Sequence, residues 1–453
     1  MPRIDTVAII GAGPSGLALA LALHKQSIAC TLYEARASAL DIGGAMMLCP
    51  NGLRILDSLG VYSRIRPEGY EFDKLYFRSP DDQPMDTYEF GGVEQYGYRA
   101  MRIYRHVLIR ELSAMVREAG IPIEYHKKFV RVLAETEKDI TWEFSDGSTA
   151  TATCVVGADG IHSRVRHYLY PGLEPSFTKM VIVAAAVPTS QLQVPSSYNL
   201  PVTILNQQHG AVFIAPQLGD GSEVMVGRQK RSEQLTREGW DELLNNNKEW
   251  CMDFLRQGSD DFPEIVQRAV SNITPEKIFL WPLFIVPKLG TWTSRHGRVV
   301  IVGDAAHAIP PAAGQGVNQA FEDVFTYSLM LGRSDKDALA RSLKVWQTRR
   351  QERIDKSLVG SRPSGKAWGL PASRLPITTT ECARSVYIAH KCSSEGAIRV
   401  YELDEKTFSL PGQYGFHRQH HPPDEAVCAP LDSTFMSPGC DRVRVALVRP
   451  RSK

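Results

Sequence analysis

One segment of the sequence combines a single carboxylate with a nearly bare backbone. It is GDAAHAIPPAAGQG, from Gly303 to Gly316, and its one acidic side chain is Asp304. The apolar run 299–302 before it predicts a buried strand that ends at this carboxylate. The apolar residues after it recur at helical spacing, so a helix is expected to begin at a glycine-rich loop. Its free N–H groups and positive dipole end can stabilise negative charge on a ligand. The loop backbone there belongs to Gly314, Gly316 and Val317.

A second segment has the spacing of a nucleotide-binding turn. GAGPSG, residues 11–16, separates the apolar run 6–10 from a stretch that predicts a buried helix. In such a unit the first glycine permits the tight turn, the second lets backbone N–H groups approach a pyrophosphate, and the third lets the helix pack on the strand. An acid about 20 residues further on can accept hydrogen bonds from ribose hydroxyls and would repel a 2′-phosphate. The motif therefore favours FAD or NAD and does not choose between them. Its residues are Gly11, Gly13, Ser15, Gly16 and Glu34.

A third segment is TCVVGADGIHSRVR, residues 153–166. In it a predicted strand is again followed by a single aspartate, Asp159. Ser163 can cap a helix that begins near Arg164. Taken alone, this pattern fits an ordinary strand-to-helix turn with an Asx cap as well as it fits a ligand site.

Together the three segments resemble the class A flavin-dependent aromatic hydroxylases typified by para-hydroxybenzoate hydroxylase, over about residues 4–360. The resemblance implies that Asp304 hydrogen-bonds the ribityl or pyrophosphate part of FAD and that the 314–317 backbone lies against the flavin pyrimidine edge. Asp159 would belong to the motif that assists NAD(P)H binding. Arg105, in YRHVLIREL, resembles a residue that contacts the flavin, although it could also be a surface helix charge. Gly44 and Ala45 fall where the family's backbone passes the isoalloxazine ring.

The resemblance implies an α/β fold with a Rossmann-type FAD-binding domain interleaved with an antiparallel substrate sheet. The short strand patterns and turns between about 179 and 272 are typical of hairpins. We assign residues 1–70, 100–178 and 275–360 to the first domain, 71–99 and 179–274 to the second, and 361–453 to an irregular tail.

The family binds its aromatic substrate between this sheet and the flavin. Candidate pocket residues here are Phe213, Met225, Arg228 and Gln207, but a one-residue slip in strand parity exchanges the two sheet faces. The basic run Arg228, Lys230 and Arg231 is alternatively a solvated edge that blocks strand pairing. No acid–base triad is identified as catalytic, and His307 is expected to be a packed, hydrogen-bonded residue.

The implied activity is a monooxygenase that uses NADPH or NADH and O₂ to hydroxylate or epoxidise an electron-rich aromatic or polycyclic small molecule through a flavin C4a-hydroperoxide. The sequence has no second GxGxxG unit. The resemblance implies that NAD(P)H binds transiently, without a nucleotide domain of its own. A flavin dehydrogenase or oxidase that inserts no oxygen is the alternative enzyme, and a binding protein without turnover is the alternative of another class.

Composition favours small-molecule partners. The formal net charge of +2 gives no basic field for nucleic acid. No signal peptide is recognised and no apolar run approaches the roughly 20 residues of a membrane span, so we expect a cytoplasmic protein. The 8 cysteines include no CxxC pair and are expected to be reduced thiols.

The C-terminal third changes character after one more helix, expected at 334–358 with Leu339, Leu343 and Trp346 on its buried face. We expect its basic residues to be solvated: Arg349, Arg350, Arg353 and Lys356. Residues 361–453 have no sustained periodicity, and HRQHHPPDE has no acids or cysteines at matching ligand spacing, so no metal site is expected at His417, His420 and His421.

We therefore expect a chain that lacks residues 375–453 to bind FAD as the full chain does. Flavin absorbance of the purified truncated protein checks this, and a truncated protein that cannot take up FAD would contradict it.

Overall fold

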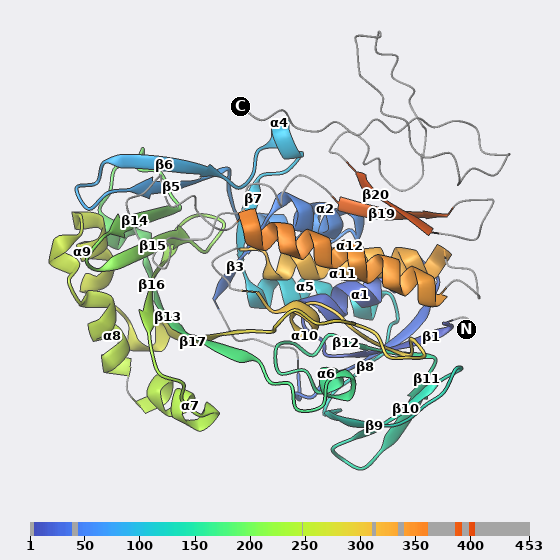
Figure 1. Ribbon diagram of the computed structural model, residues 1–453. Coiled ribbons are helices and arrows are strands. Elements are labelled where there is room, and N and C mark those ends of the chain that lie inside the picture. The colour runs from blue at the N-terminus through green and yellow to red at the C-terminus, as the bar shows by residue number, and fades with distance from the viewer. Residues whose placement is uncertain are drawn as a thin grey trace, which may run out of the picture.

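The computed structural model describes residues 4–38, 44–246, 248–309, 314–333, 339–360, 386–391 and 398–403. A five-stranded parallel sheet lies in one half of the molecule, in the order β18-β12-β1-β2-β8 (Figure 1). Its central strands are apolar and almost wholly buried, as expected where both faces of a parallel sheet are covered. The strands are β1 (Thr6–Ile10), β2 (Ala29–Tyr33), β8 (Ile123–Glu124), β12 (Cys154–Gly157) and β18 (Val299–Ile301).

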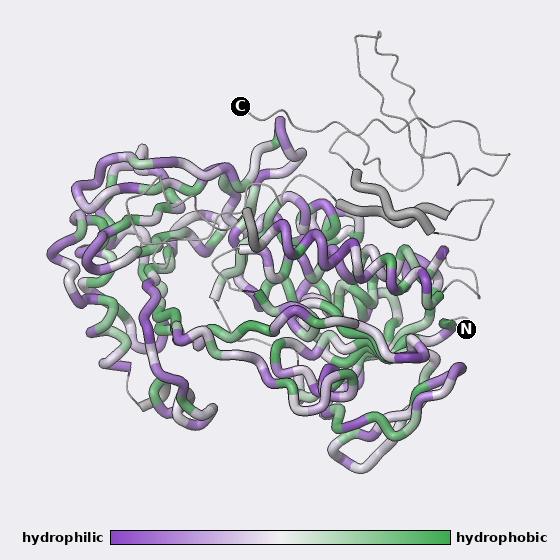
Figure 2. The backbone as a smooth tube through the Cα atoms, viewed as in Figure 1, coloured by the Kyte–Doolittle hydropathy of each residue, from purple (hydrophilic) through white to green (hydrophobic). Residues whose placement is uncertain are grey.

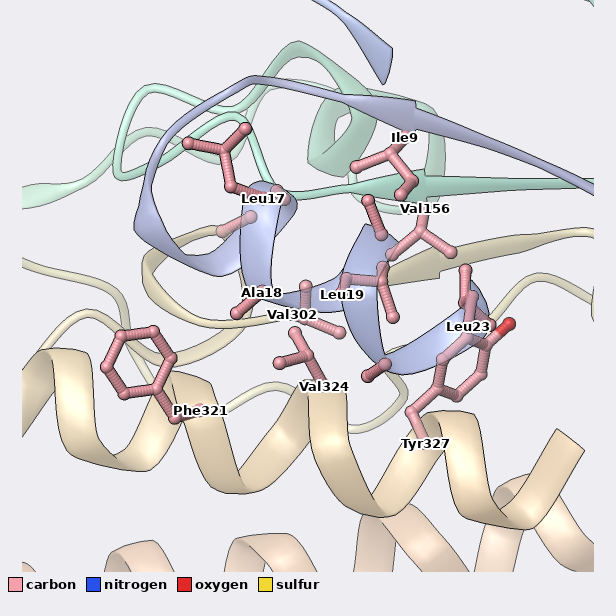
Figure 3. Packing of buried hydrophobic residues seen from close by; sticks show 14 of the residues in the cluster. Ile9, Leu17, Ala18, Leu19, Leu23, Val156, Val302, Phe321, Val324 and Tyr327 are labelled. Carbon is pink, nitrogen blue, oxygen red and sulfur yellow. The ribbon is translucent and has the colours of Figure 1, made fainter. Parts of the chain in front are cut away.

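Helices α1 (Pro14–Lys25), α5 (Arg105–Glu118) and α11 (Gly316–Arg333) pack over this sheet (Figure 1). α1 is buried along nearly its whole length because it lies between the strands and α11. Figure 3 shows Leu19 of α1 between the strand residue Val156 and the α11 residue Val324. Alternating alanine and leucine in α1 therefore suits a helix that is enclosed on both sides.

A second, seven-stranded sheet fills the other half, in the order β17-β13-β16-β15-β14-β5-β6 (Figure 1). All neighbours are antiparallel except β14 and β5. Helices α7 (Arg237–Asn246), α8 (Lys248–Arg256) and α9 (Glu264–Ser271) lie outside this sheet, and α8 and α9 pack on one of its faces. The strands are β5 (Lys74–Arg78), β6 (Pro84–Glu89), β13 (Ser176–Pro188), β14 (Val202–Asn206), β15 (Gly210–Pro216), β16 (Glu223–Arg231) and β17 (Ile278–Ile285).

Smaller elements complete the two halves. A sheet of β3 (Ala45–Leu48), β7 (Ala100–Tyr104) and β4 (Tyr70–Phe72) joins them. β9 (Phe129–Glu135), β10 (Ile140–Phe144) and β11 (Thr149–Ala152) form another sheet. The short helices are α2 (Pro50–Ser58), α3 (Tyr62–Ile65), α4 (Val93–Tyr96), α6 (Arg164–Leu169) and α10 (Asp304–His307), with single 3₁₀ turns at 66–68, 189–192, 259–261 and 275–277.

The expected α/β fold class is confirmed, and strand pairing changes two details. β17 pairs with β13. Residues 278–285 therefore belong to the seven-stranded sheet and not to the FAD-binding domain, to which we assigned residues 275–360. β16 lies between β13 and β15, so its basic run is not an edge.

The segment after 360 also differs from a wholly irregular tail. β19 (Val386–Lys391) and β20 (Ile398–Leu403) form an antiparallel hairpin that packs against α11 and against α12 (Leu339–Gly360). The three C-terminal histidines considered for metal binding lie outside the described residues.

Among the described residues, no helix is long and apolar enough to cross a membrane, and no group of three or more His, Cys, Asp or Glu side chains could hold a metal ion. The cysteines of these ranges are free thiols: Cys30, Cys49, Cys154 and Cys251.

α12 carries a hydrophilic sequence (Figure 2), yet two of its arginines are buried, which corrects the expectation that they are solvated. Arg350 donates to Asp323 Oδ1 at 2.7 Å and to Glu322, and Arg353 donates to Glu322 at 3.2 and 3.3 Å. Asp323 Oδ2 accepts from His307 and, at 2.9 Å, from the backbone N–H of Gly303. His307 is therefore packed and hydrogen-bonded, as expected.

Burial alone would raise the pKa of both carboxyl groups, but their cationic neighbours lower the pKa of each below its usual range. Arg353 and Arg350 act on Glu322, and His307 and Arg350 act on Asp323. The stability from these ionised groups is complete above the unfolded pKa of about 4. It is lost as pH falls through the lower folded values.

Arg350→Met is expected to destabilise the fold by about 3–5 kcal/mol, because it leaves two buried carboxylates without a principal partner. The matched control is Arg349→Met, since Arg349 is half-exposed and pairs only with the half-exposed Glu352. Its effect should stay within about 0.5 kcal/mol. Urea unfolding of both variants measures the difference, and equal losses would contradict the role of the buried cluster.

Candidate active site

The glycine turn after β1 is closed by backbone contacts. Gly11 has φ +105°, and a Cβ there would lie 2.6 Å from the carbonyl oxygen of Ala158. A Cβ at Gly16 would lie 1.9 Å from the carbonyl oxygen of Gly11. Gly13, by contrast, precedes the first turn of α1, and a Cβ there would meet no protein atom within 4 Å. Gly11 and Gly16 thus allow close packing of the backbone, whereas Gly13 leaves the N-terminus of α1 accessible to a ligand.

Glu34 lies beside this turn at the end of β2 and is 6% exposed. Its Oε2 accepts from the N–H of Ala12 at 2.9 Å, and its Oε1 accepts from the N–H of Arg36 at 3.0 Å. The acid expected from the spacing therefore lies against the glycine turn.

Asp159 occupies the turn after β12, and its two carboxylate oxygens differ in their hydrogen-bond partners. Oδ2 accepts from the N–H groups of Arg164 and Val165 at 2.7 and 3.2 Å, while Ser163 caps the same helix, α6, through the N–H of Arg166. Oδ1 is buried without a hydrogen-bond partner. Burial raises the pKa of Asp159, opposed by hydrogen bonds from the Ser163 side chain and from backbone N–H groups. The Asx cap is thus real, and it leaves one acceptor available.

The turn after β18 meets both the glycine turn and α5. A Cβ at Gly303 would lie 3.1 Å from Ser15 Oγ. Asp304 begins α10 with an exposed side chain, and its charge raises the pKa of Arg105 against the larger lowering effect of burial. Arg105 is half-buried at the first position of α5 and is not a plain surface charge.

The loop before α11 is held by Asn318, which sequence reasoning did not select. Its side-chain N–H₂ donates to the carbonyls of Gly314 and Met47 at 2.8 and 3.1 Å, and its Oδ1 accepts from the N–H of Cys49 at 3.0 Å. Gly314 has φ +61°, and its Cβ would lie 3.4 Å from Met47 Sδ. The buried asparagine at the start of a predicted helix was the available signal, since such a side chain needs partners.

Two neighbouring positions complete this part of the site. A Cβ at Gly316 would lie 3.9 Å from Asp304 Oδ1, so the Asp304 turn and the α11 loop are adjacent. Val317, on the first turn of α11, is half-buried against the main core.

Gly44 and Ala45 lie next to the seven-stranded sheet. The N–H of Ala45 donates to Gln217 Oε1 at 3.3 Å, and a Cβ at Gly44 would lie 3.0 Å from the Trp281 ring. Gln217 also donates to Tyr104 Oη at 2.9 Å, which links β3, β7 and the sheet.

Strand register divides the pocket candidates. Phe213 and Met225 lie on the sheet face without helices, where the guanidinium of Arg102 lies 5.5 Å from the Phe213 ring and Nη2 lies 3.9 Å from Met225 Sδ. Arg228 points to the opposite face, where it donates to backbone carbonyls of Phe254, Leu255, Gln257 and His209. Gln207 is exposed in the β14–β15 turn. We therefore leave Arg228 and Gln207 out of the pocket.

These groups fit a flavin dinucleotide. The open N-terminus of α1 at Gly13 suits a pyrophosphate. Glu34 supplies a carboxylate for hydroxyl groups, and Asp159 Oδ1 is a buried acceptor that lacks a donor. Arg105 adds a cation beside Asp304. Three turns that are far apart in the sequence therefore converge on one cradle.

Comparison with known proteins agrees with this geometry. The model of a family described as FAD binding domain matches residues 5–359. The 3-amino-4-hydroxybenzoate 2-monooxygenase PtnB3 of Streptomyces platensis is 30% identical over 380 residues, covering 82% of this chain and 89% of the relative. The 6-hydroxynicotinate 3-monooxygenase of Bordetella bronchiseptica is 26% identical and covers 78% and 89%. Klebsiella pneumoniae HpxO, solved with FAD and uric acid, matches in fold with a TM-score of 0.65 at 22% identity, covering 78% and 86%.

The chain therefore belongs to the FAD-binding domain family. It is an FAD-dependent monooxygenase of the class A type, which decides against the dehydrogenase alternative.

Gly13→Ala and Gly16→Ala are expected to separate ligand binding from folding. Gly13→Ala should weaken FAD binding at least about tenfold, because its methyl group meets no protein atom but lies where the backbone approaches the pyrophosphate. Gly16→Ala should destabilise the apoprotein, because its methyl group collides with the Gly11 carbonyl.

FAD titration and thermal unfolding of both apoproteins measure the two effects. Unchanged FAD affinity in a stable Gly13→Ala protein would contradict the assigned pyrophosphate position.

Proposed function

We propose that the protein uses NAD(P)H and O₂ to hydroxylate an electron-rich aromatic small molecule bound between the seven-stranded sheet and the β3-β7 strands. One observation carries this proposal: Phe213 and Met225 contact Arg102, Phe213 and Met47 pack on the same apolar cluster, and Met47 lies against the Gly314 loop of the cofactor cradle. The two relatives named above act on 3-amino-4-hydroxybenzoate and 6-hydroxynicotinate, both aromatic.

When bound, FAD supplies the redox chemistry by accepting a hydride from NAD(P)H and activating O₂. The chain's own residues bind and orient. Gly13 and the N-terminus of α1 hold the pyrophosphate, and Glu34 holds the ribose. Asp304 and Arg105 hold the ribityl side, while Asp159 Oδ1 accepts a hydrogen bond at the same cradle.

The N-terminus of α11 has an electrostatic role. The loop from Gly314 to Val317 turns free N–H groups and the positive dipole end of an 18-residue helix toward the cradle. This helix end would stabilise negative charge on the pyrimidine edge of a bound flavin. Asn318 keeps these N–H groups aligned because it fastens the loop to β3.

The substrate side is formed by apolar side chains that exclude water. A buried cluster of Cys49, Phe72, Leu75, Phe77, Phe90, Ala100 and Leu205 packs with Met47 and Phe213. A dry aromatic wall favours a flat ring and protects reactive oxygen species from water. Substrate positioning therefore replaces a dedicated acid–base triad.

Isotope tracing tests the proposal. The FAD-loaded enzyme is supplied with NADH or NADPH, ¹⁸O₂ and a panel of hydroxylated aromatic compounds, and products are analysed by mass spectrometry. We expect one ¹⁸O atom per hydroxylated product and none when only the water is labelled. Dehydrogenated product without label, or NAD(P)H oxidation that yields only hydrogen peroxide across the panel, would overturn the proposal.

A further inference from the structure

Arg102 is a buried arginine on the sheet-facing side of β7. Its neighbours Met101 and Ile103 point into the main core, so alternation turns Arg102 toward β15 and β16. In register it lies between Met47 of β3 and Tyr70 of β4. The residue is only 3% exposed.

The contacts of Arg102 provide little compensation for its charge. Nε donates to the carbonyl oxygen of Pro216 at 2.8 Å, and Nη2 lies 3.9 Å from the sulfur of Met225. The guanidinium also lies 5.5 Å from the centre of the Phe213 ring. Within the ranges that the structure describes, no aspartate or glutamate forms an ion pair with Arg102.

Three other buried arginines, by comparison, have more partners. Arg350 and Arg353 pair with the carboxylates of Asp323 and Glu322. Arg228 donates to several backbone carbonyls. An unpaired buried charge costs several kcal/mol, so Arg102 would gain from an added anion.

Arg102 nevertheless remains a cation. Burial lowers the pKa of Arg102 to about 10, opposed in part by the adjacent Tyr104. At neutral pH the guanidinium is therefore still protonated and keeps donor N–H groups beyond the one that Pro216 accepts.

We propose that Arg102 binds the carboxylate of an aromatic acid substrate and so selects aromatic acids over neutral rings. This inference rests on the proposed function, which places an aromatic ring beside Phe213. A carboxylate is ionised throughout the neutral range and matches the planar guanidinium, whereas most phenols are neutral there. The ring then packs on Phe213 and Met225 while its carboxylate neutralises Arg102.

The test compares acids with their amides on the FAD-loaded enzyme. Dissociation constants are measured from flavin absorbance changes with 4-hydroxybenzoate, 3-amino-4-hydroxybenzoate and 6-hydroxynicotinate, each against its carboxamide. 4-Nitrophenolate reports on recognition of a ring oxygen anion instead. The variants are Arg102→Met and Arg102→Lys, and the matched control is Arg99→Met, because Arg99 is half-exposed and pairs with Asp73.

The wild-type protein and Arg99→Met should bind at least one acid more than about 30-fold tighter than its amide, since a buried charge pair loses that much when one partner is removed. Arg102→Met should abolish this preference while amide affinity and FAD content stay unchanged, and Arg102→Lys should keep part of it. The melting temperature of Arg102→Met should not fall, because removal of an unpaired buried charge is not destabilising.

Three results would overturn the inference. In the first, the wild-type protein binds no acid in preference to its amide. In the second, Arg102→Met loses acid and amide affinity equally. In the third, Arg102→Met weakens the binding of 4-nitrophenolate but of none of the carboxylic acids. Incorporation of ¹⁸O into a neutral aromatic compound alone would leave the proposed function intact while the inference about Arg102 fails.

Discussion

The buried carboxylate of Asp323 needs donors on both oxygens, and this need fixes the turn that presents Asp304. One oxygen accepts from the backbone N–H of Gly303 and from His307, and the other accepts from Arg350 of α12. An ionised group without water is tolerated only when it is fully hydrogen-bonded and paired. β18, its glycine turn, α11 and α12 are therefore held in one arrangement. A turn with a positive φ, as at Gly303, would otherwise be among the more pliable parts of the chain.

The cofactor cradle is made largely of backbone, and side chains of the chain position that backbone. Gly11 packs on the turn of Asp159, and Gly303 packs on Ser15, so each turn limits the movement of the other two. Asn318 extends this arrangement to β3, and Gln217 connects β3 to the seven-stranded sheet. These hydrogen bonds connect the substrate face directly to the cradle. The apolar cluster around Phe90 and Phe213 then determines what lies next to the flavin.

The three turns of the cradle could be located in the sequence because their features are local. Strand, glycine turn and helix follow one another within a few residues, and Glu34 ends the next strand at a fixed distance. Features that depend on tertiary packing were less accessible. Arg228 was placed in the pocket because strand parity cannot be read without the register. Arg350 resembles its neighbour Arg349 in sequence, and only the position of Glu322 and Asp323 across α11 shows that it is buried. Arg102 was not selected, since a single arginine in an apolar strand has no recognisable spacing.

Hydrogen–deuterium exchange of the apoprotein with and without saturating FAD tests the convergence of the three turns most directly. FAD should slow exchange together in peptides that cover residues 11–16, 157–160 and 303–304, and in the loop at 314–318, while the helices over the seven-stranded sheet change little. Protection confined to one of these segments, or found mainly around α7 to α9, would contradict a single cradle.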